Sequence, residues 1–275
     1  MFPTRIEIIP SAGIVDLVQD LVPRTTTLTM TCLPHHGIER TVRASVELAA
    51  LGYKVIPHLA ARSLQSRSEL TGILRDCDVA GIKEVFVIGG DRKNSAGPYE
   101  SALPVLEDIA QYTGGMMRAG VAGYPEGHPT VAALDLIDAL QDKQHLATSV
   151  VTQMCFDAPK ILDFAALLRR EGVDLPVWAG VAGSVPRTKL VALATKIGVG
   201  SSLKFLSRKG PLARKLLSGD RYSPDPLVAA LENQPGIAGI HLYSFNNLDA
   251  VPNEAAASST KALQPDLIRG AARDN

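Results

Sequence analysis

Two carboxylates stand where a buried strand would not normally carry charge. Glu7 lies inside "RIEIIP" (5–10), between two isoleucines, and Asp91 follows the apolar run and two glycines of "VFVIGGD". Strand alternation puts Glu7 on the opposite face from Ile6 and Ile8. Burial there would raise its pKa, and the residue could then act as a general acid near neutral pH. The alternative is a Glu on the outer strand face, paired with an arginine of a helix.

Further polar residues close other apolar runs of the chain. They are Thr31, His58, Tyr124, Glu126, His128, Gln153, Tyr243 and Asn246. In a parallel barrel the carboxyl ends of the strands meet at one face, and active sites lie there. The sequence therefore predicts one site, built from many strand ends.

Eight strands and seven intervening helical patterns predict this barrel. The expected strands are 5–10, 27–32, 54–59, 84–89, 116–124, 149–154, 175–182 and 237–245. The expected helices are 14–22, 38–52, 69–81, 98–114, 130–147, 158–172 and 187–198. A doubly wound open sheet is the rival fold, but its phosphate-binding GxGxxG does not follow the first strand.

The fold class we predict is α/β, a single (β/α)8 TIM barrel. An elaborated loop is expected between strands 7 and 8, where 201–219 and 225–234 look helical. The tail from Pro252 onward would be helical or partly disordered. Because no low-complexity linker divides the chain, we expect residues 1–275 to form one catalytic domain.

Composition narrows the classes of partner. The 28 basic and 28 acidic residues balance, which argues against nucleic acid. No apolar run is long enough for a membrane span and no signal peptide is evident, so we expect a cytoplasmic protein. Cys32, Cys77 and Cys155 form no paired motif and are interpreted as buried thiols.

The sequence contains no motif that indicates a metal site or a covalent intermediate. The histidines match no metal-ligand spacing, and His58 after Pro57 is interpreted as a hydrogen-bonding or stacking group. Lys54 and Lys83 lie at strand starts rather than strand ends, which argues against a Schiff base, and no GxSxG is present. Acids, amides and glycine-lined space suit a flat, polar-edged ligand and a hydride transfer.

The chain resembles the methylenetetrahydrofolate reductase family. The resemblance runs from about residue 5 to 247 through "RIEIIP", "IPHLAAR", "VIGGDR", "AGYPEGHP", "VVTQMCFD" and "IHLYSFN". It implies a (β/α)8 barrel that reduces 5,10-methylenetetrahydrofolate to 5-methyltetrahydrofolate, an oxidoreductase of one-carbon metabolism. The family passes electrons from NAD(P)H through a non-covalent FAD.

The resemblance also implies roles for individual residues. Glu7 matches the acid that protonates folate N10, and Asp91 matches the aspartate that stabilises the resulting cation beside the pterin. The implied substrate-binding residues are Gln153 and Asp91. We also expect Tyr243 and Asn247, at the end of the last strand, to bind the substrate, with Asn247 standing where the family often has an arginine. The implied cofactor-binding residues are Thr31, His58, Gly90, Tyr124, His128 and Asp135. Glu39, Arg40 and Thr41 match the E-R-T that opens the family's second helix.

Some departures from the family fall on the flavin side. The arginine of the R-G-D turn is Gly89 here, and Lys143 is the remaining candidate for a lysine that usually follows the fifth strand. Either FAD binds weakly through other contacts, or hydride passes directly from the nicotinamide to folate.

Two other classes of function remain open. A folate-linked methyltransferase on the same barrel would transfer a methyl group without NAD(P)H. A non-catalytic folate-binding relative would have little need of Glu7 and Asp91. A homo-oligomer is compatible with each of these functions.

Overall fold

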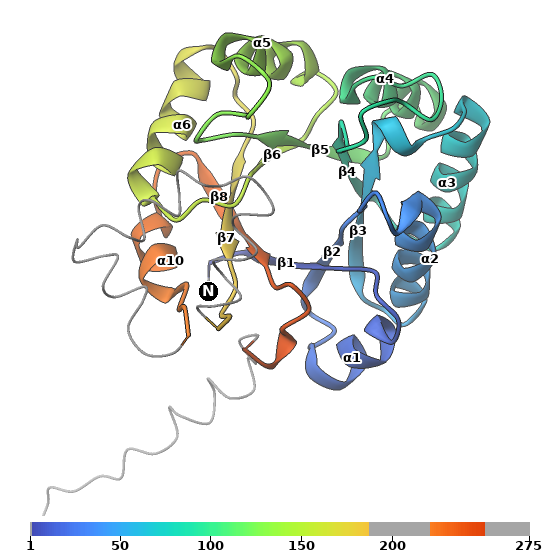
Figure 1. Cartoon of the computed structure of the whole chain (residues 1–275), viewed down its shortest axis with the longest axis horizontal. Coiled ribbons are helices and arrows are strands. Elements are labelled where there is room, and N and C mark those ends of the chain that lie inside the picture. The colour runs from blue at the N-terminus through green and yellow to red at the C-terminus, as the bar shows by residue number, and fades with distance from the viewer. Residues whose placement is uncertain (1, 187–220, 251–275) are drawn as a thin grey trace, which may run out of the picture.

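The computed structural model describes residues 2–186 and 221–250. These residues form a closed barrel of eight parallel strands in the order β1 to β8, with neighbouring strands paired throughout (Figure 1). The strands are β1 Thr4–Ile8, β2 Thr27–Met30, β3 Lys54–Ala60, β4 Glu84–Ile88, β5 Arg118–Gly123, β6 Ser149–Thr152, β7 Val177–Ala182 and β8 Ile237–Tyr243. Closure confirms the predicted (β/α)8 barrel and excludes the open sheet.

Helices cover the outside of this barrel, as Figure 1 shows. Within the described residues they are α1 Ile14–Leu21, α2 Gly37–Ala50, α3 Arg67–Val79, α4 Ala102–Thr113, α5 Ala133–Lys143, α6 Ala158–Arg170 and α10 Asp225–Leu231, with 3₁₀ turns at Ala61–Ser63 and Leu248–Ala250. The predicted helix 187–198, the stretch 201–219 and the tail from Pro252 lie outside the described residues.

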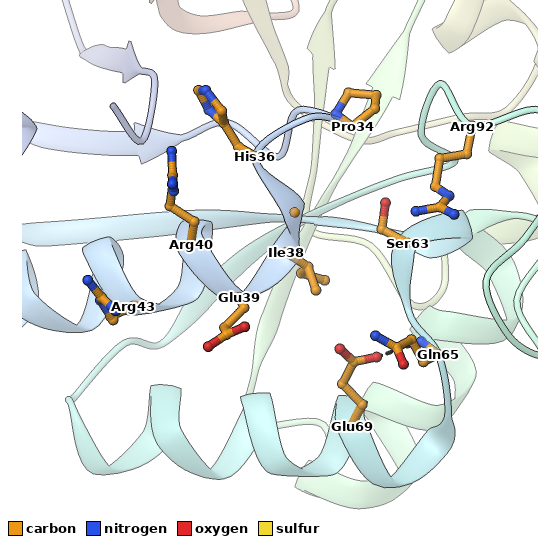
Figure 2. A pocket seen from close by; sticks show the side chains of 11 residues that line it. Pro34, His36, Ile38, Glu39, Arg40, Arg43, Ser63, Gln65, Glu69 and Arg92 are labelled. Atoms are coloured by element: carbon orange, nitrogen blue, oxygen red, sulfur yellow. Dashed lines mark hydrogen bonds between the residues drawn. The ribbon is translucent and has the colours of Figure 1, made fainter. Parts of the chain in front are cut away.

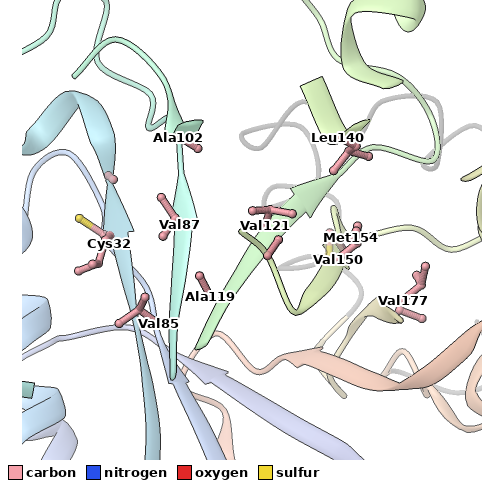
Figure 3. Close-up of a cluster of buried hydrophobic side chains, with 14 of the residues drawn as sticks. Cys32, Val85, Val87, Ala102, Ala119, Val121, Leu140, Val150, Met154 and Val177 are labelled. Carbon is pink, nitrogen blue, oxygen red and sulfur yellow. The ribbon is translucent and has the colours of Figure 1, made fainter. Parts of the chain in front are cut away.

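The main core lies between the strands and the helices. Val85, Val87, Val121 and Val150 point outward from β4, β5 and β6 toward helix residues such as Leu140 (Figure 3). Successive side chains of a strand point to opposite faces, so every second residue points into the barrel interior. The apolar periodicity of the helices matches this outer surface.

The interior of the barrel is filled in layers. Ile56, Phe86 and Val151 form an apolar cluster in the middle, with Trp178 packed against it. Below it, toward the amino ends of the strands, Glu84 is an ion-pair partner of two arginines. Its carboxylate lies 2.8 Å from Arg5 and 2.8 Å from Arg118. The interior is therefore solid below the mouth, as in other barrels of this size.

Two further features bear on the sequence predictions. Cys32, Cys77 and Cys155 are buried, which confirms their interpretation as buried thiols. Among the described helices, none combines the length and apolar character that a membrane span requires.

Candidate functional site

Glu7 lies inside the barrel mouth, on β1. Its Oε2 is 2.8 Å from Nε2 of His241 on β8 and 3.8 Å from Nε2 of His58 on β3. Its side chain is 13% exposed, whereas those of His58 and His241 are 5% and 1% exposed. The inward orientation of Glu7 follows from strand alternation, and the alternative of an outer-face glutamate is wrong.

The two histidines are held by aromatic neighbours. The His58 ring packs edge-on against Phe86, with centroids 4.7 Å apart, and the His241 ring packs against Tyr243 at 4.9 Å. Burial lowers the pKa of His58 to about 4, against the opposing effect of Glu7. His58 is therefore neutral at neutral pH.

Sequence reasoning missed His241. A signal was available, because His241 stands two residues before Tyr243 in β8 and so shares its face of the strand. Its position beside Glu7 depends on the pairing of β8 with β1, in which Arg5 is opposite His241 and Glu7 is opposite Tyr243.

The loop after β8 fixes the end of β1. Ser244 donates a hydrogen bond to the Glu7 carbonyl, and the Asn246 side chain bonds both the N–H and the carbonyl of Ile9, at 2.7 and 3.0 Å. Phe245 and Asn246 have φ values of 51° and 58°, in the left-handed region that costs non-glycine residues about 1 kcal/mol or more. The hydrogen bonds of Asn246 offset this cost, so Asn246 positions the backbone next to Glu7.

Tyr243 crosses the mouth from β8 to β6. Its hydroxyl donates a hydrogen bond to the Thr152 carbonyl, at 3.0 Å. A Cβ at Gly180 on the intervening strand would come within 2.2 Å of the Thr152 oxygen and 2.9 Å of the Tyr243 ring. Gly180 therefore provides the space for this crossing, and burial raises the pKa of Tyr243. The hydroxyl is thus engaged in linking two strands of the barrel, and the ring is the part of Tyr243 that can contact a ligand.

The other predicted substrate residues lie on neighbouring strand ends. Gln153 follows β6 and is half-buried, and its Oε1 accepts a hydrogen bond from the Met154 N–H at 2.9 Å. Asn247 donates a hydrogen bond to the Ser184 carbonyl after β7. Asp91 is exposed in the turn after β4. Burial raises the pKa of Tyr124, and the charge of Asp91 adds to that shift. Glu7 is thus enclosed in the mouth, while Asp91 lies on the rim.

The predicted cofactor residues occupy the same end of the barrel. Thr31 is buried, and its carbonyl accepts a hydrogen bond from Thr41, which fastens α2 to β2. Tyr124 and His128 form an edge-on ring pair with centroids 5.0 Å apart. Asp135 is exposed in the first turn of α5.

Gly90 shows why the turn after β4 needs glycine. Its φ is 88°, and a Cβ there would lie 3.1 Å from the Cβ of Ala60. Backbone can approach a flat ring closely at such a position.

Lys143 cannot contact a ligand in the barrel mouth. It lies in the last turn of α5, the end of that helix that leads to the amino end of β6. Because helix and strand run in opposite directions in a βα unit, Lys143 is at the far end of the barrel. A lysine that sequence reasoning missed is at the near end: Lys160, in the first turn of α6, pairs with Glu126 at 2.7 Å.

A pocket of about 410 Å³ opens on the rim beside α2 and the loops after β3 and β4. Figure 2 shows Arg40 and His36 on one side of it, Arg92 and Ser63 on another, and Glu39 and Glu69 below. Arg62, near the glycine that replaces the family's arginine, bonds the carbonyls of Glu100 and Arg92. Arg92 is exposed beside the opening.

These features define a class: a (β/α)8 barrel protein with a polar site at the carboxyl ends of its strands. A profile of the family described as methylenetetrahydrofolate reductase matches residues 13–204. The chain therefore belongs to the methylenetetrahydrofolate reductase family, as its motifs predicted.

A curated relative agrees with this assignment. Methylenetetrahydrofolate reductase 2 of Saccharomyces cerevisiae (strain ATCC 204508 / S288c) is 26% identical over 178 residues, which are 60% of this chain and 29% of the relative. The chain thus spans less than a third of that relative's length.

Solved structures support the fold alone. Oxaloacetate acetylhydrolase in complex with 3,3-difluorooxalacetate superposes with a TM-score of 0.55 at 10% identity, over 95% of this chain and 80% of its own. The 2,3-dimethylmalate lyase, a PEP mutase/isocitrate lyase superfamily member, gives 0.52 at 7% identity, over 94% and 79%.

Proposed function

We propose that this protein reduces 5,10-methylenetetrahydrofolate to 5-methyltetrahydrofolate with NAD(P)H, and that Glu7 is the general acid. Family membership supports the reaction class. The observation that carries the role of Glu7 is its position in the mouth, largely buried and 2.8 Å from His241. A carboxyl group enclosed there can deliver a proton to a ligand without competition from bulk water.

The reaction needs one proton and one hydride. Glu7 protonates folate N10, and the N10–methylene bond breaks to leave a 5-iminium cation. Asp91 on the rim stabilises that positive charge. Hydride from the nicotinamide C4 then adds to the methylene carbon, which becomes the methyl group, and NAD(P)⁺ leaves. Gln153 presents its amide to the pterin edge, next to the Tyr243 ring.

The residues present do not fit FAD in the way that the family holds it. Gly89 offers no side chain to a phosphate, and the nearby Arg62 is bonded to two backbone carbonyls. Lys143 is at the wrong end of the barrel, and Lys160 at the near end is already paired with Glu126. A charge-assisted contact contributes about 1.5–3 kcal/mol, so two losses weaken flavin binding by roughly a hundredfold or more. We therefore propose direct hydride transfer from the nicotinamide to folate.

The rim pocket is the proposed site for the phosphates of NAD(P)H. Arg40 and Arg92 lie across its opening from each other, and its volume of about 410 Å³ is in the range of small-molecule sites. Arginine suits phosphate because its guanidinium can donate two parallel hydrogen bonds. Arg92→Ala should raise the KM for NAD(P)H several-fold and leave the folate KM unchanged, whereas Arg75→Ala on α3 should change neither.

Stopped-flow mixing of flavin-stripped protein with methylenetetrahydrofolate and NADH or NADPH tests the reaction. Oxidation of the nicotinamide with formation of methyltetrahydrofolate is expected without added flavin. Activity that returns only in proportion to added FAD would refute direct transfer. Methyl transfer that needs no nicotinamide would favour the methyltransferase instead.

The acid is tested by Glu7→Gln, which removes the proton donor at nearly constant volume. Turnover should fall by about a hundredfold or more, with folate binding within a few-fold of wild type. Glu107→Gln, a change at an exposed glutamate of α4, is the matched control and should retain full activity. Retained turnover in Glu7→Gln would remove Glu7 from this role.

A further inference from the structure

The three side chains at the mouth have a donor geometry that the proposed reduction does not use. Glu7, His58 and His241 each present one donor atom, and these atoms all lie within 4.8 Å of one another. The three residues come from β1, β3 and β8, so no local motif in the sequence could show them together. Below they are called the mouth triad.

We propose that the mouth triad is a binding site for a divalent transition-metal ion of the Zn²⁺ class, and that the bound ion blocks the acid. Binding itself is independent of the proposed reduction, whereas the inhibition rests on Glu7 being the acid of that reaction.

The distances suit such an ion. Metal–ligand bonds of about 2.0–2.2 Å in a tetrahedral site place neighbouring donor atoms about 3.3 Å apart. The Glu7 Oε2 lies 2.8 Å from one histidine Nε2 and 3.8 Å from the other, on either side of that value. Side-chain shifts of about 1 Å are enough to surround an ion.

The donor types select the class of ion. Two imidazole nitrogens and one carboxylate oxygen suit Zn²⁺, Co²⁺, Ni²⁺ or Fe²⁺, whereas Mg²⁺ and Ca²⁺ prefer oxygen ligands alone. The Nε2 atom of His58 is buried and makes no hydrogen bond in the described part of the chain. Such an atom loses its solvation without a partner, and a metal ion would supply one.

The site is also held in place before an ion arrives. Neighbouring strands fix the three backbones, and the rings of Phe86 and Tyr243 pack edge-on against the two histidines. Glu7 is the most exposed member, so the open coordination position faces the mouth, where water or a ligand can enter. A rigid cluster with an open side is the arrangement of accessible rather than structural metal sites.

Occupation would inhibit the reduction, because Glu7 Oε2 cannot hold a metal ion and a transferable proton together. The ion would also fill the space that folate N10 must approach. Traces of zinc would then lower the activity of the purified enzyme, and a chelator would restore it.

Isothermal titration calorimetry of Zn²⁺ into tag-free, chelator-treated full-length protein tests binding without reference to catalysis. One site per chain with a Kd on the order of micromolar or lower is expected, and Mg²⁺ should give no comparable heat. His58→Gln and His241→Gln should each weaken Zn²⁺ binding by more than tenfold. His145→Gln, a change at an exposed histidine between α5 and β6, should leave it unchanged. Thermal melts check that each variant is folded. If His241→Gln does not fold, His58→Gln alone tests the site.

Absent binding in wild type, or equal binding in all variants, would overturn the site. The assay of folate reduction with and without Zn²⁺ is read separately. Inhibition that EDTA reverses in wild type supports the blocking of the acid. Calorimetric binding at the mouth triad without inhibition would leave the metal site standing and refute the role of Glu7 as acid.

Discussion

The buried ion pairs beneath the site give the sharpest test of how the barrel interior is stabilised. Glu84 is 4% exposed in its side chain and lies 2.8 Å from both Arg5, which is 11% exposed, and Arg118, which is 51% exposed. Arg5 also lies 3.8 Å from the centre of the Trp178 ring. Burial lowers the pKa of Arg5, and the charge of Glu84 opposes that shift.

Glu84→Gln removes the charge and almost no volume. Arg5 is then a buried cation without its countercharge, which typically costs about 3–5 kcal/mol. The glutamine oxygen can still accept one hydrogen bond, so we expect a loss of about 3 kcal/mol in the free energy of unfolding. For a domain of this size the loss lowers Tm by about 6–12 °C.

Arg118→Gln is the matched control for this change. It removes the half-exposed partner and leaves the Arg5–Glu84 pair intact, so the expected loss is about 1 kcal/mol or less. Urea unfolding followed by circular dichroism measures both variants, with the slope m compared to wild type. Equal losses in the two variants, or a loss below about 1 kcal/mol for Glu84→Gln, would refute the reasoning.

Three further predictions concern the site and its frame. Gln153→Ala should raise the folate KM more than it lowers kcat, because an amide that reads the pterin edge binds ground and transition states alike, and a pure kcat loss would contradict this. Gly239→Ala should destabilise the fold by several kcal/mol, because the added Cβ would lie 2.6 Å from Trp178. The control Gly72→Ala in α3 meets nothing within 4 Å and should stabilise the fold by about 0.5–1 kcal/mol. Urea unfolding that ranks the two variants otherwise would refute the packing argument. The Cys77 thiol, whose pKa burial raises to about 12, should resist alkylation in native protein near neutral pH and react once the protein is unfolded in urea, and rapid native labelling would contradict its burial.

The order of elements was predictable from sequence because it depends on local patterns. All eight predicted strands are present, and their ends differ from the predicted ones by a few residues. Strand alternation also predicted that Glu7 faces inward, since its neighbours Ile6 and Ile8 are buried on the outer side. Glycine and polar residues at strand ends marked the face where the site lies.

The tertiary structure alone decided which side chains meet. His241 and His58 lie beside Glu7 because the register of the closed barrel brings β1, β3 and β8 to one level, and no spacing along the chain encodes that register. The Tyr243 hydroxyl bonds Thr152, two strands away, because Gly180 leaves the space between them. Local sequence determines the direction in which a side chain points, whereas the closure of the barrel determines its partners, because those contacts join segments far apart in the chain.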